Sequence, residues 1–298
     1  MEESCAQLSQ SQSPASIRMR PLSPAMGAEV RGIDLSQPLD DATFGVLQDL
    51  WHQHCVLCLP GQTLGELDQV RFAERFGEPA ATLHKYESGN GHPALMYVTN
   101  EKKDGKFVGA LPDGEMFFHS DMCYLERPSM ATMLYAMVIP SAGGNTLFAN
   151  MYQAYDALPE ATKRRLAGLK AVNTYDPGKS DYALMRTRTH VQSPTARSFV
   201  QPIVTVHPAT GKKVLFINRL MTEYVVDMPF VESTALLESL FNHQEQTRFI
   251  YEHRWTPGDV VIWDNRCTLH ARTDFSGGEL RKLRRVTVKG ERPVGSID

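Results

Sequence analysis

The sequence predicts an antiparallel β architecture decorated by helices. Short apolar runs of strand type recur along the chain between turn residues, without the regular alternation of strands and helices of a doubly wound parallel sheet. The glycine-rich motifs that bind nucleotides, GxGxxG after a strand and GxxxxGK[ST], do not occur in the sequence. The 298 residues contain no internal repeat and no low-complexity linker, so one domain is the simplest expectation.

The helices follow from periodicity and capping residues. After two short strand-like pieces, a helix is expected at about 40–54, where LDDATF supplies an acidic cap. A second helix is expected over TLGELDQVRFAERFG, closed by Gly77. Two more are expected at about 151–168 and 230–247.

The strands are expected wherever apolar and β-branched residues gather between turn signals. HPATGKKVLF is expected to form a hairpin with its turn at Thr210-Gly211. The strand-like runs, in order, are CVLCLP, ALMYVTN, MATMLYAMV, VQPIVTVHP, VLFIN, DVVIWDN and RRVTVKG.

Composition excludes some classes of partner. The net charge of −3 and the pI near 6.4 provide no basic surface for nucleic acid or an anionic membrane, and no apolar stretch approaches the length of a membrane span. Residues 1–16 are polar, lack the features of a signal peptide and are expected to be a disordered tail. The five irregularly spaced cysteines are expected to be reduced, buried thiols in a cytoplasmic protein.

His119 and Asp121 stand two residues apart at the mouth of an apolar run, FFHSDMCYLERPSMATMLYAMV. In an extended segment they would project to the same side, either as surface residues, as a hydrogen-bonded pair, or as two metal ligands. His270 follows the buried run DVVIW, where it is either a hydrogen-bonded histidine or a third ligand. Two imidazoles and one carboxylate on one face of a metal are the ligands of non-haem Fe(II) oxygenases.

Further motifs surround these residues in a fixed order. They are GAEVRGIDLSQPLDD, LPGQ, RFGEP, the HxD pair, GGNT, HPATGKKVLFIN and a tail that reads WDN…H…R…R. From about Ile17 to Val288 the chain thereby resembles the TauD/TfdA (taurine and phenoxyacetate dioxygenase) family of Fe(II)- and 2-oxoglutarate-dependent dioxygenases. The resemblance implies a mainly β fold with flanking helices (α+β), a double-stranded β-helix of the jelly-roll or cupin type. It also implies a single domain over 17–290, with 291–298 as a C-terminal tail.

The resemblance assigns roles to individual residues. His119, Asp121 and His270 match the iron ligands and so the catalytic centre. Thr146 and Arg281 match the residues that bind the distal carboxylate of 2-oxoglutarate. A guanidinium suits that task, because it can hold a carboxylate through two parallel hydrogen bonds. Arg285, four residues beyond Arg281, would face the same side of a strand and anchor an anionic group of the substrate.

The implied reaction uses Fe(II), 2-oxoglutarate and O₂ to hydroxylate the substrate, with succinate and CO₂ as co-products and, where the carbon bears a heteroatom, with cleavage of that bond. Asp121 argues against halogenation, since halogenating relatives carry a small residue there. Desaturation stays open. So do two other classes, a zinc-type metallohydrolase and a non-catalytic binding module on the same fold.

The substrate is the least defined expectation. Candidate substrate residues are His84, Tyr86, Glu115, Phe117 and Arg285. Glu115 departs from the taurine enzymes, which carry an amide there, and would either favour a cationic group or face solvent. The apolar, partly aromatic residues around the HxD pair favour a small aromatic or alkyl carboxylate or sulfonate. The family's members are commonly dimers or tetramers, so a homo-oligomer is expected.

Overall fold

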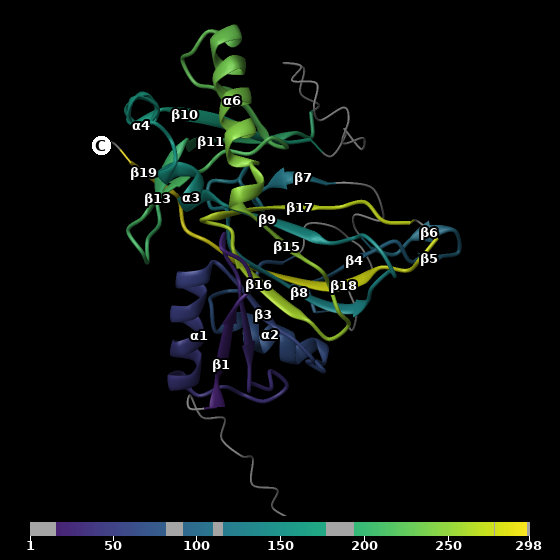
Figure 1. Ribbon diagram of the computed structural model, residues 1–298. Helices are drawn as coiled ribbons and strands as arrows, with labels where there is room; N and C mark the ends of the chain where they lie inside the picture. The colour runs from purple at the N-terminus through teal and green to yellow at the C-terminus, as the bar shows by residue number, and fades with distance from the viewer. Residues whose placement is uncertain (1–15, 82–91, 110–115, 177–193, 277, 297–298) are drawn as a thin grey trace, which may run out of the picture.

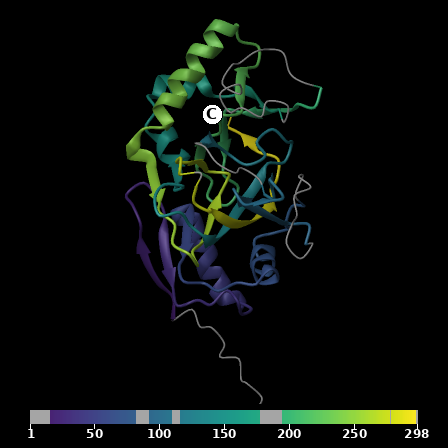
Figure 2. The same ribbon diagram turned by 90° about the vertical axis from the view of Figure 1, so that its right-hand side faces the viewer.

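A computed structural model describes residues 16–81, 92–109, 116–176, 194–276 and 278–296 (Figures 1 and 2). Two main β-sheets face each other in the middle of the molecule, with α1 and α2 at one end and α6 at the other. No helix within these ranges is long and apolar enough to cross a membrane. The predicted mainly β architecture with flanking helices is therefore confirmed.

The larger sheet has seven strands and is antiparallel except where its second and third strands pair in parallel. In spatial order its strands are β1 (Arg18–Pro21), β2 (Ala28–Arg31), β3 (Val56–Leu59), β16 (Val260–Asp264), β8 (Ser129–Val138), β18 (Lys282–Lys289) and β4 (Leu95–Thr99). Strands from the two ends of the chain thus lie side by side. Such pairings need long-range contacts that local sequence patterns do not specify.

The smaller sheet has four antiparallel strands, in the order β15 (Ile250–His253), β9 (Thr146–Asn150), β17 (Thr268–Arg272) and β7 (Met116–His119). Three accessory sheets accompany this pair. One consists of β11 (Arg197–Pro202), β10 (Lys170–Tyr175) and β14 (Thr222–Val225), and another of β13 (Lys213–Leu215), β12 (Val204–Val206) and β19 (Val294–Gly295). The last is the hairpin of β5 (Lys102–Lys103) and β6 (Lys106–Phe107). The β12–β13 pair is the hairpin expected from HPATGKKVLF.

The helices of the described residues are α1 (Asp41–His54), α2 (Glu66–Glu74), α3 (Met151–Asp156), α4 (Glu160–Leu166), α6 (Phe230–Gln244) and the 3₁₀ turn η2 (Thr247–Phe249). Asp40 caps α1 by accepting a hydrogen bond from the backbone N–H of Thr43, as the acidic sequence there predicted. The single helix expected at 151–168 is wrong: it is divided into α3 and α4 at Pro159, which precedes α4. Proline has no N–H with which to continue a helix, but it is tolerated at a helix start.

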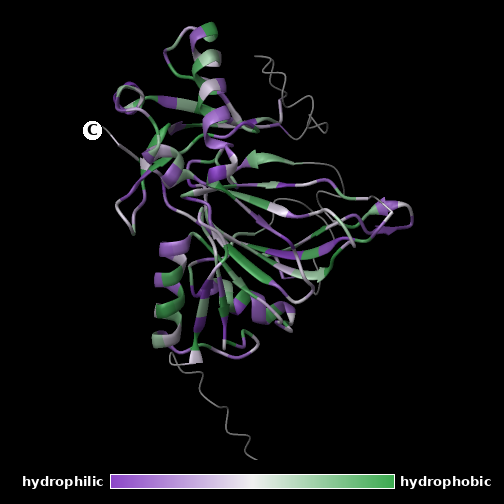
Figure 3. Cartoon of the chain, in the orientation of Figure 1, coloured by the Kyte–Doolittle hydropathy of each residue, from purple (hydrophilic) through white to green (hydrophobic). Residues whose placement is uncertain are grey.

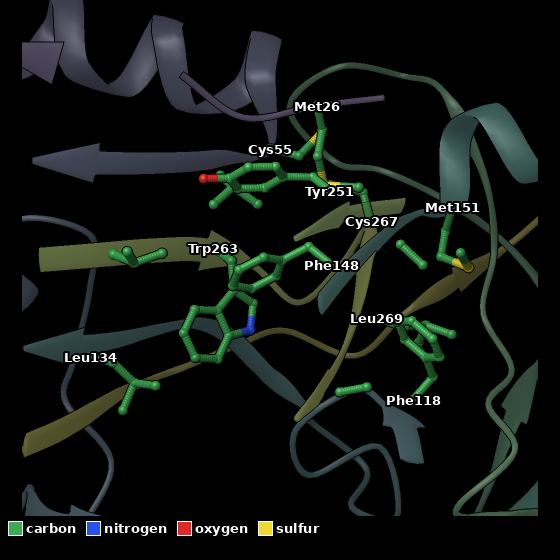
Figure 4. Packing of buried hydrophobic residues seen from close by; sticks show 14 of the residues in the cluster. Met26, Cys55, Phe118, Leu134, Phe148, Met151, Tyr251, Trp263, Cys267 and Leu269 are labelled. Atoms are coloured by element: carbon green, nitrogen blue, oxygen red, sulfur yellow. The ribbon is translucent and has the colours of Figure 1, made fainter. Parts of the chain in front are cut away.

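Side chains alternate between the two faces of the larger sheet with the period of two that strands impose. Leu134, Val261 and Leu283 belong to the core between the sheets, whereas Met133, Ile262 and Val286 pack beneath α1 and α2. Figure 4 shows Phe148 and Trp263 packed against each other inside the first of these cores, with their rings tilted by 59°, and Figure 3 shows the hydrophobic character of the central strands. Two apolar layers therefore hold the sheet from both sides.

Two other expectations are tested by the described residues. Cys55, Cys58, Cys123 and Cys267 are free and buried, as expected, while Cys5 lies outside the described residues. Part of the segment expected to be a C-terminal tail is packed, because Val294–Gly295 pairs with β12.

Candidate active site

His119, Asp121 and His270 come together at the edge of the smaller sheet. His119 is the last residue of β7 and lies opposite His270 of β17 in the strand register. Asp121 follows in the turn after β7, where Met122 adopts a left-handed backbone with φ of 59°. One donor atom from each of the three side chains lies within 4.8 Å of the others. The strand register thus brings together His119 and His270, which are 151 positions apart in the sequence.

The two imidazoles are suited to bind a cation. Nδ1 of His119 lies 2.9 Å from the carbonyl oxygen of Phe117, which only accepts, so the proton resides on Nδ1 and the Nε2 lone pair is available. Burial lowers the pKa of His119, and burial together with the neighbouring His119 lowers the pKa of His270 well below its ordinary value. Both rings are therefore neutral at pH 7. Two neutral nitrogens and one carboxylate fit a divalent first-row metal with open coordination positions.

A chain of hydrogen bonds fixes the carboxylate of Asp121. The indole N–H of Trp263 donates to Oδ1 of Asn265 over 2.9 Å, and Nδ2 of Asn265 donates to Oγ1 of Thr132 over 2.9 Å. Thr132 in turn donates to Oδ2 of Asp121 over 2.6 Å. Since an indole can only donate, the direction of every later bond is determined. Asp121 must accept, and is held as an oriented anion.

We predict that Thr132→Val weakens metal binding by about 10- to 100-fold, the usual effect of removing a hydrogen bond to a metal ligand. Valine keeps the shape of the side chain but leaves Asp121 without this donor. Titration with Mn(II), followed by electron paramagnetic resonance, measures the effect. Thr205→Val, at a buried threonine of β12, is the control and should leave affinity unchanged. Equal affinities in the Thr132 variant and the wild type would show that the chain does not support the ligand.

Arg285 completes the surroundings of Asp121. Its Nη2 lies 2.6 Å from Oδ1 of Asp121, as an ion pair that lacks the alignment of a hydrogen bond. Burial by itself would raise the pKa of Asp121, but the positive charge of Arg285 and the hydrogen bond from Thr132 help to lower it below its ordinary value. Nε of Arg285 is buried and has no hydrogen-bond partner among the described residues. The guanidinium therefore has donors to spare for a further acceptor.

Arg281 is a buried cation for which the described residues provide no carboxylate partner. Its side chain is 2% exposed, and its Nε donates to the carbonyl oxygen of Gly144 over 3.0 Å. Gly144 has φ of +64°, and a Cβ there would come within 2.9 Å of Nε of Arg281. The glycine pair of GGNT therefore makes the turn on which this arginine rests. Burial, and then the nearby Arg272, lowers the pKa of Arg281 to about 9. An anion bound here would relieve that cost.

Two cavities meet at this site. A small one of about 50 Å³ is lined by the two histidines, Thr146 and three arginines: Arg272, Arg281 and Arg285. A larger one of about 550 Å³ shares Met116, Ala271 and Arg272 with it and extends past Phe117 and Leu220. The small cavity is thus strongly cationic, and the larger one begins with an apolar wall.

Most of the predicted site residues are brought together. Arg285 faces the cavity as predicted, whereas Phe117 lines only the larger cavity; His84, Tyr86 and Glu115 lie outside the described residues. Sequence reasoning missed Arg272, although its position two residues after His270 on one strand was a signal that both face the same side. It also missed Thr132 and Asn265, polar residues in otherwise apolar stretches.

Comparison with known proteins places this arrangement in a family. The family model "Taurine catabolism dioxygenase TauD, TfdA family" matches residues 18–287. The (S)-phenoxypropionate/alpha-ketoglutarate-dioxygenase of Delftia acidovorans is 33% identical over 268 residues, which cover 85% of this chain and 88% of the relative. The alpha-ketoglutarate-dependent sulfate ester dioxygenase of Pseudomonas putida is 33% identical over 284 residues, which cover 93% of this chain and 91% of the relative.

Solved structures agree in fold. A taurine dioxygenase from Burkholderia xenovorans superposes with a TM-score of 0.79 at 28% identity and covers 94% of this chain and 91% of its own. AAD-2, solved in complex with Mn(II) and N-oxalylglycine, superposes with a TM-score of 0.78 at 27% identity, and the match covers 93% of this chain and 99% of AAD-2. The expected double-stranded β-helix is thereby confirmed, and the dioxygenase is favoured over the hydrolase and the binding module. The chain belongs to the TauD/TfdA family of dioxygenases.

Proposed function

We propose that the protein is an Fe(II)- and 2-oxoglutarate-dependent dioxygenase in which His119, Asp121 and His270 hold the iron. The observation that supports this most directly is the convergence of their donor atoms within 4.8 Å beside a cavity lined by three arginines. Bound there, iron would activate O₂ for hydroxylation of the substrate while 2-oxoglutarate is converted to succinate and CO₂. A cytoplasmic homo-oligomer is part of the same proposal.

Thr146 and Arg281 are proposed to bind the distal carboxylate of 2-oxoglutarate. Both line the small cavity, and both are buried. A carboxylate there would supply a negative charge that none of the described residues provides to the buried guanidinium, and it would accept from the Thr146 hydroxyl as well. The residues of this pocket therefore orient the cosubstrate and exclude water around its distal end.

Arg285 is proposed to bind an anionic group of the primary substrate. Its unpartnered Nε and its position beside a metal ligand would place a substrate anion next to the reacting atoms. The larger cavity has Met116, Phe117, Phe118 and Leu220 on its wall, which suits the aromatic or alkyl part of a carboxylate or sulfonate. Acidic residues such as Glu223, Glu238 and Glu245 line it as well, so the anionic group belongs at the arginines of the small cavity. The named relatives act on phenoxypropionate, an aryloxy carboxylate, and on sulfate esters, which are anionic as well.

Succinate formation from 2-oxoglutarate tests the proposal. The assay contains Fe(II), ascorbate and air, with aryloxyalkanoates, arylcarboxylates, alkyl sulfonates, sulfate esters and taurine as candidate substrates. We expect succinate to rise with one class and to be lost in the His119→Ala protein. No succinate with any compound, together with no anaerobic absorption band on adding Fe(II) and 2-oxoglutarate, would refute the proposed function.

For the substrate identified in that assay, we predict that Arg285→Gln raises KM by about 100-fold, since a charge-assisted hydrogen bond contributes roughly 1.5–3 kcal/mol. The anaerobic affinity for 2-oxoglutarate should change little, because Arg281 is retained. Arg285→Lys should recover part of the loss by restoring the charge. An unchanged substrate KM in the Gln variant would mean that another arginine, with Arg272 as the first candidate, binds the substrate anion.

A further inference from the structure

Trp255 is buried behind Thr146 and lines neither of the two cavities at the site. Its indole N–H donates to Oγ1 of Thr146 over 3.0 Å. Thr146 does line the small cavity, together with Arg281. The contact therefore joins a residue of the hydrophobic core to a hydroxyl at the proposed 2-oxoglutarate pocket.

We infer that Trp255 is a positioning residue for 2-oxoglutarate, because it determines which way the Thr146 hydroxyl points. The inference rests on the proposed function and assigns a task to a residue outside the pocket. A hydroxyl has one hydrogen to donate and two lone pairs, whereas an indole N–H can only donate. With one lone pair engaged by Trp255, the Thr146 hydrogen is left to donate to an anion in the cavity. Without the indole, the hydroxyl could turn a lone pair toward that anion, which would be repelled.

The indole is itself held by buried polar groups. The imidazole of His253 meets the Trp255 ring edge to face, with 4.6 Å between ring centroids. Nδ1 of His253 lies 2.9 Å from the hydroxyl of Tyr251, and Nε2 lies 3.2 Å from Oδ2 of Asp259, a close contact that lacks the alignment of a hydrogen bond. Asp259 accepts from the backbone N–H of Thr256 over 2.9 Å, which closes the turn directly after Trp255.

His253 also lies opposite Thr146 in the register of β15 and β9. Trp255, two residues after the end of β15, thus directly follows the strand that pairs with the strand of Thr146, and Figure 4 shows Tyr251 of this group inside the core. A hydrogen bond anchored at both ends keeps its direction when the cavity is empty and when it is filled. Such preorganisation strengthens the binding of the ligand that matches it.

Anaerobic titration of the Fe(II)-loaded protein, followed by its absorption band, tests the inference. The variant is Trp255→Phe, which keeps an aromatic ring and removes the N–H. The two probes are 2-oxoglutarate and 2-oxopentanoate, which has the same carbon chain with a methyl group in place of the distal carboxylate. We expect the variant to bind 2-oxoglutarate about tenfold more weakly, a typical effect of one hydrogen bond to a charged group. Its affinity for 2-oxopentanoate should equal that of the wild type.

A double-mutant cycle with Thr146→Val is the control. In the Thr146→Val protein, Trp255→Phe should not weaken the affinity for 2-oxoglutarate any further. Equal weakening for both probes, or no weakening for either, would overturn the inference while the proposed function stands. If the wild type binds neither probe, the proposed function fails and the inference fails with it. Should Trp255→Phe not fold, β-(3-benzothienyl)alanine at position 255 retains the bicyclic shape without an N–H, and the same outcomes apply.

Discussion

His270→Ala should abolish both metal binding and turnover. The variant removes one of three donors that the strand register brings within 4.8 Å of one another. Loss of a residue that only supports a ligand already weakens binding by about 10- to 100-fold, so loss of a ligand should exceed that range. Mn(II) titration by electron paramagnetic resonance and the succinate assay measure the two effects.

His52→Ala is the control for this experiment, because His52 is a half-buried histidine on α1, beneath the outer face of the larger sheet. It should retain metal binding and activity. A His270→Ala protein that binds Mn(II) as tightly as the wild type would show that the ion is held elsewhere. One that also kept full activity would remove His270 from the proposed catalytic centre.

Arg281→Met should have opposite effects on binding and on stability. We expect the affinity for 2-oxoglutarate to fall at least about 100-fold, because two charge-assisted hydrogen bonds to the distal carboxylate are lost. The free energy of unfolding of the ligand-free protein should stay the same or rise by about 1 kcal/mol. The reason is that the guanidinium, whose pKa burial lowers to about 9, is a buried charge without a counter-ion among the described residues, and relief of this charge should outweigh the hydrogen bond that Gly144 loses. Calorimetric titration and urea unfolding give the two quantities.

Arg284→Met is the matched control, three residues further along the chain. Arg284 is as buried, at 4% exposed, but lies on the other face of β18. Its guanidinium donates to the side-chain oxygen of Gln69 and to the carbonyl oxygens of Leu64 and Gly65. Removing it should therefore cost stability, about 1–3 kcal/mol for the acceptors left without donors, and leave 2-oxoglutarate binding unchanged. A loss of more than about 2 kcal/mol in Arg281→Met would contradict our account of that charge.

The elements that sequence patterns predicted well are those whose signals are local. The acidic cap and periodicity at 40–54 correspond to α1, which covers Asp41–His54, and the apolar run after it corresponds to β3. Pairing of β16 with both β3 and β8 could not be predicted in this way. It depends on contacts across about 200 residues for β3 and about 130 residues for β8, for which neither partner carries a local signal.

The residues of the candidate site likewise fall into those with a local sequence signal and those that depend on long-range contacts. The metal ligands and Arg281 stand in motifs whose spacing is readable along the chain. Thr132 and Asn265, which orient Asp121, lie 133 positions apart and meet only because β8 and β16 are neighbours. Trp255 looks like any core aromatic residue until its N–H is seen to reach Thr146. Residues that act through another residue have no pattern of their own.

The hydrogen-bond chain behind Asp121 also determines how protons reach the site. A proton wire must reverse its bonds after each transfer and be refilled from its far end. The chain here begins at the indole of Trp263, which has a hydrogen to give but no lone pair to accept one, and passes through the amide of Asn265. This chain therefore cannot conduct protons to Asp121. Protons that the reaction consumes or releases must therefore reach the site by another route, and among the described residues the cavities beside His270 and Arg272 provide one.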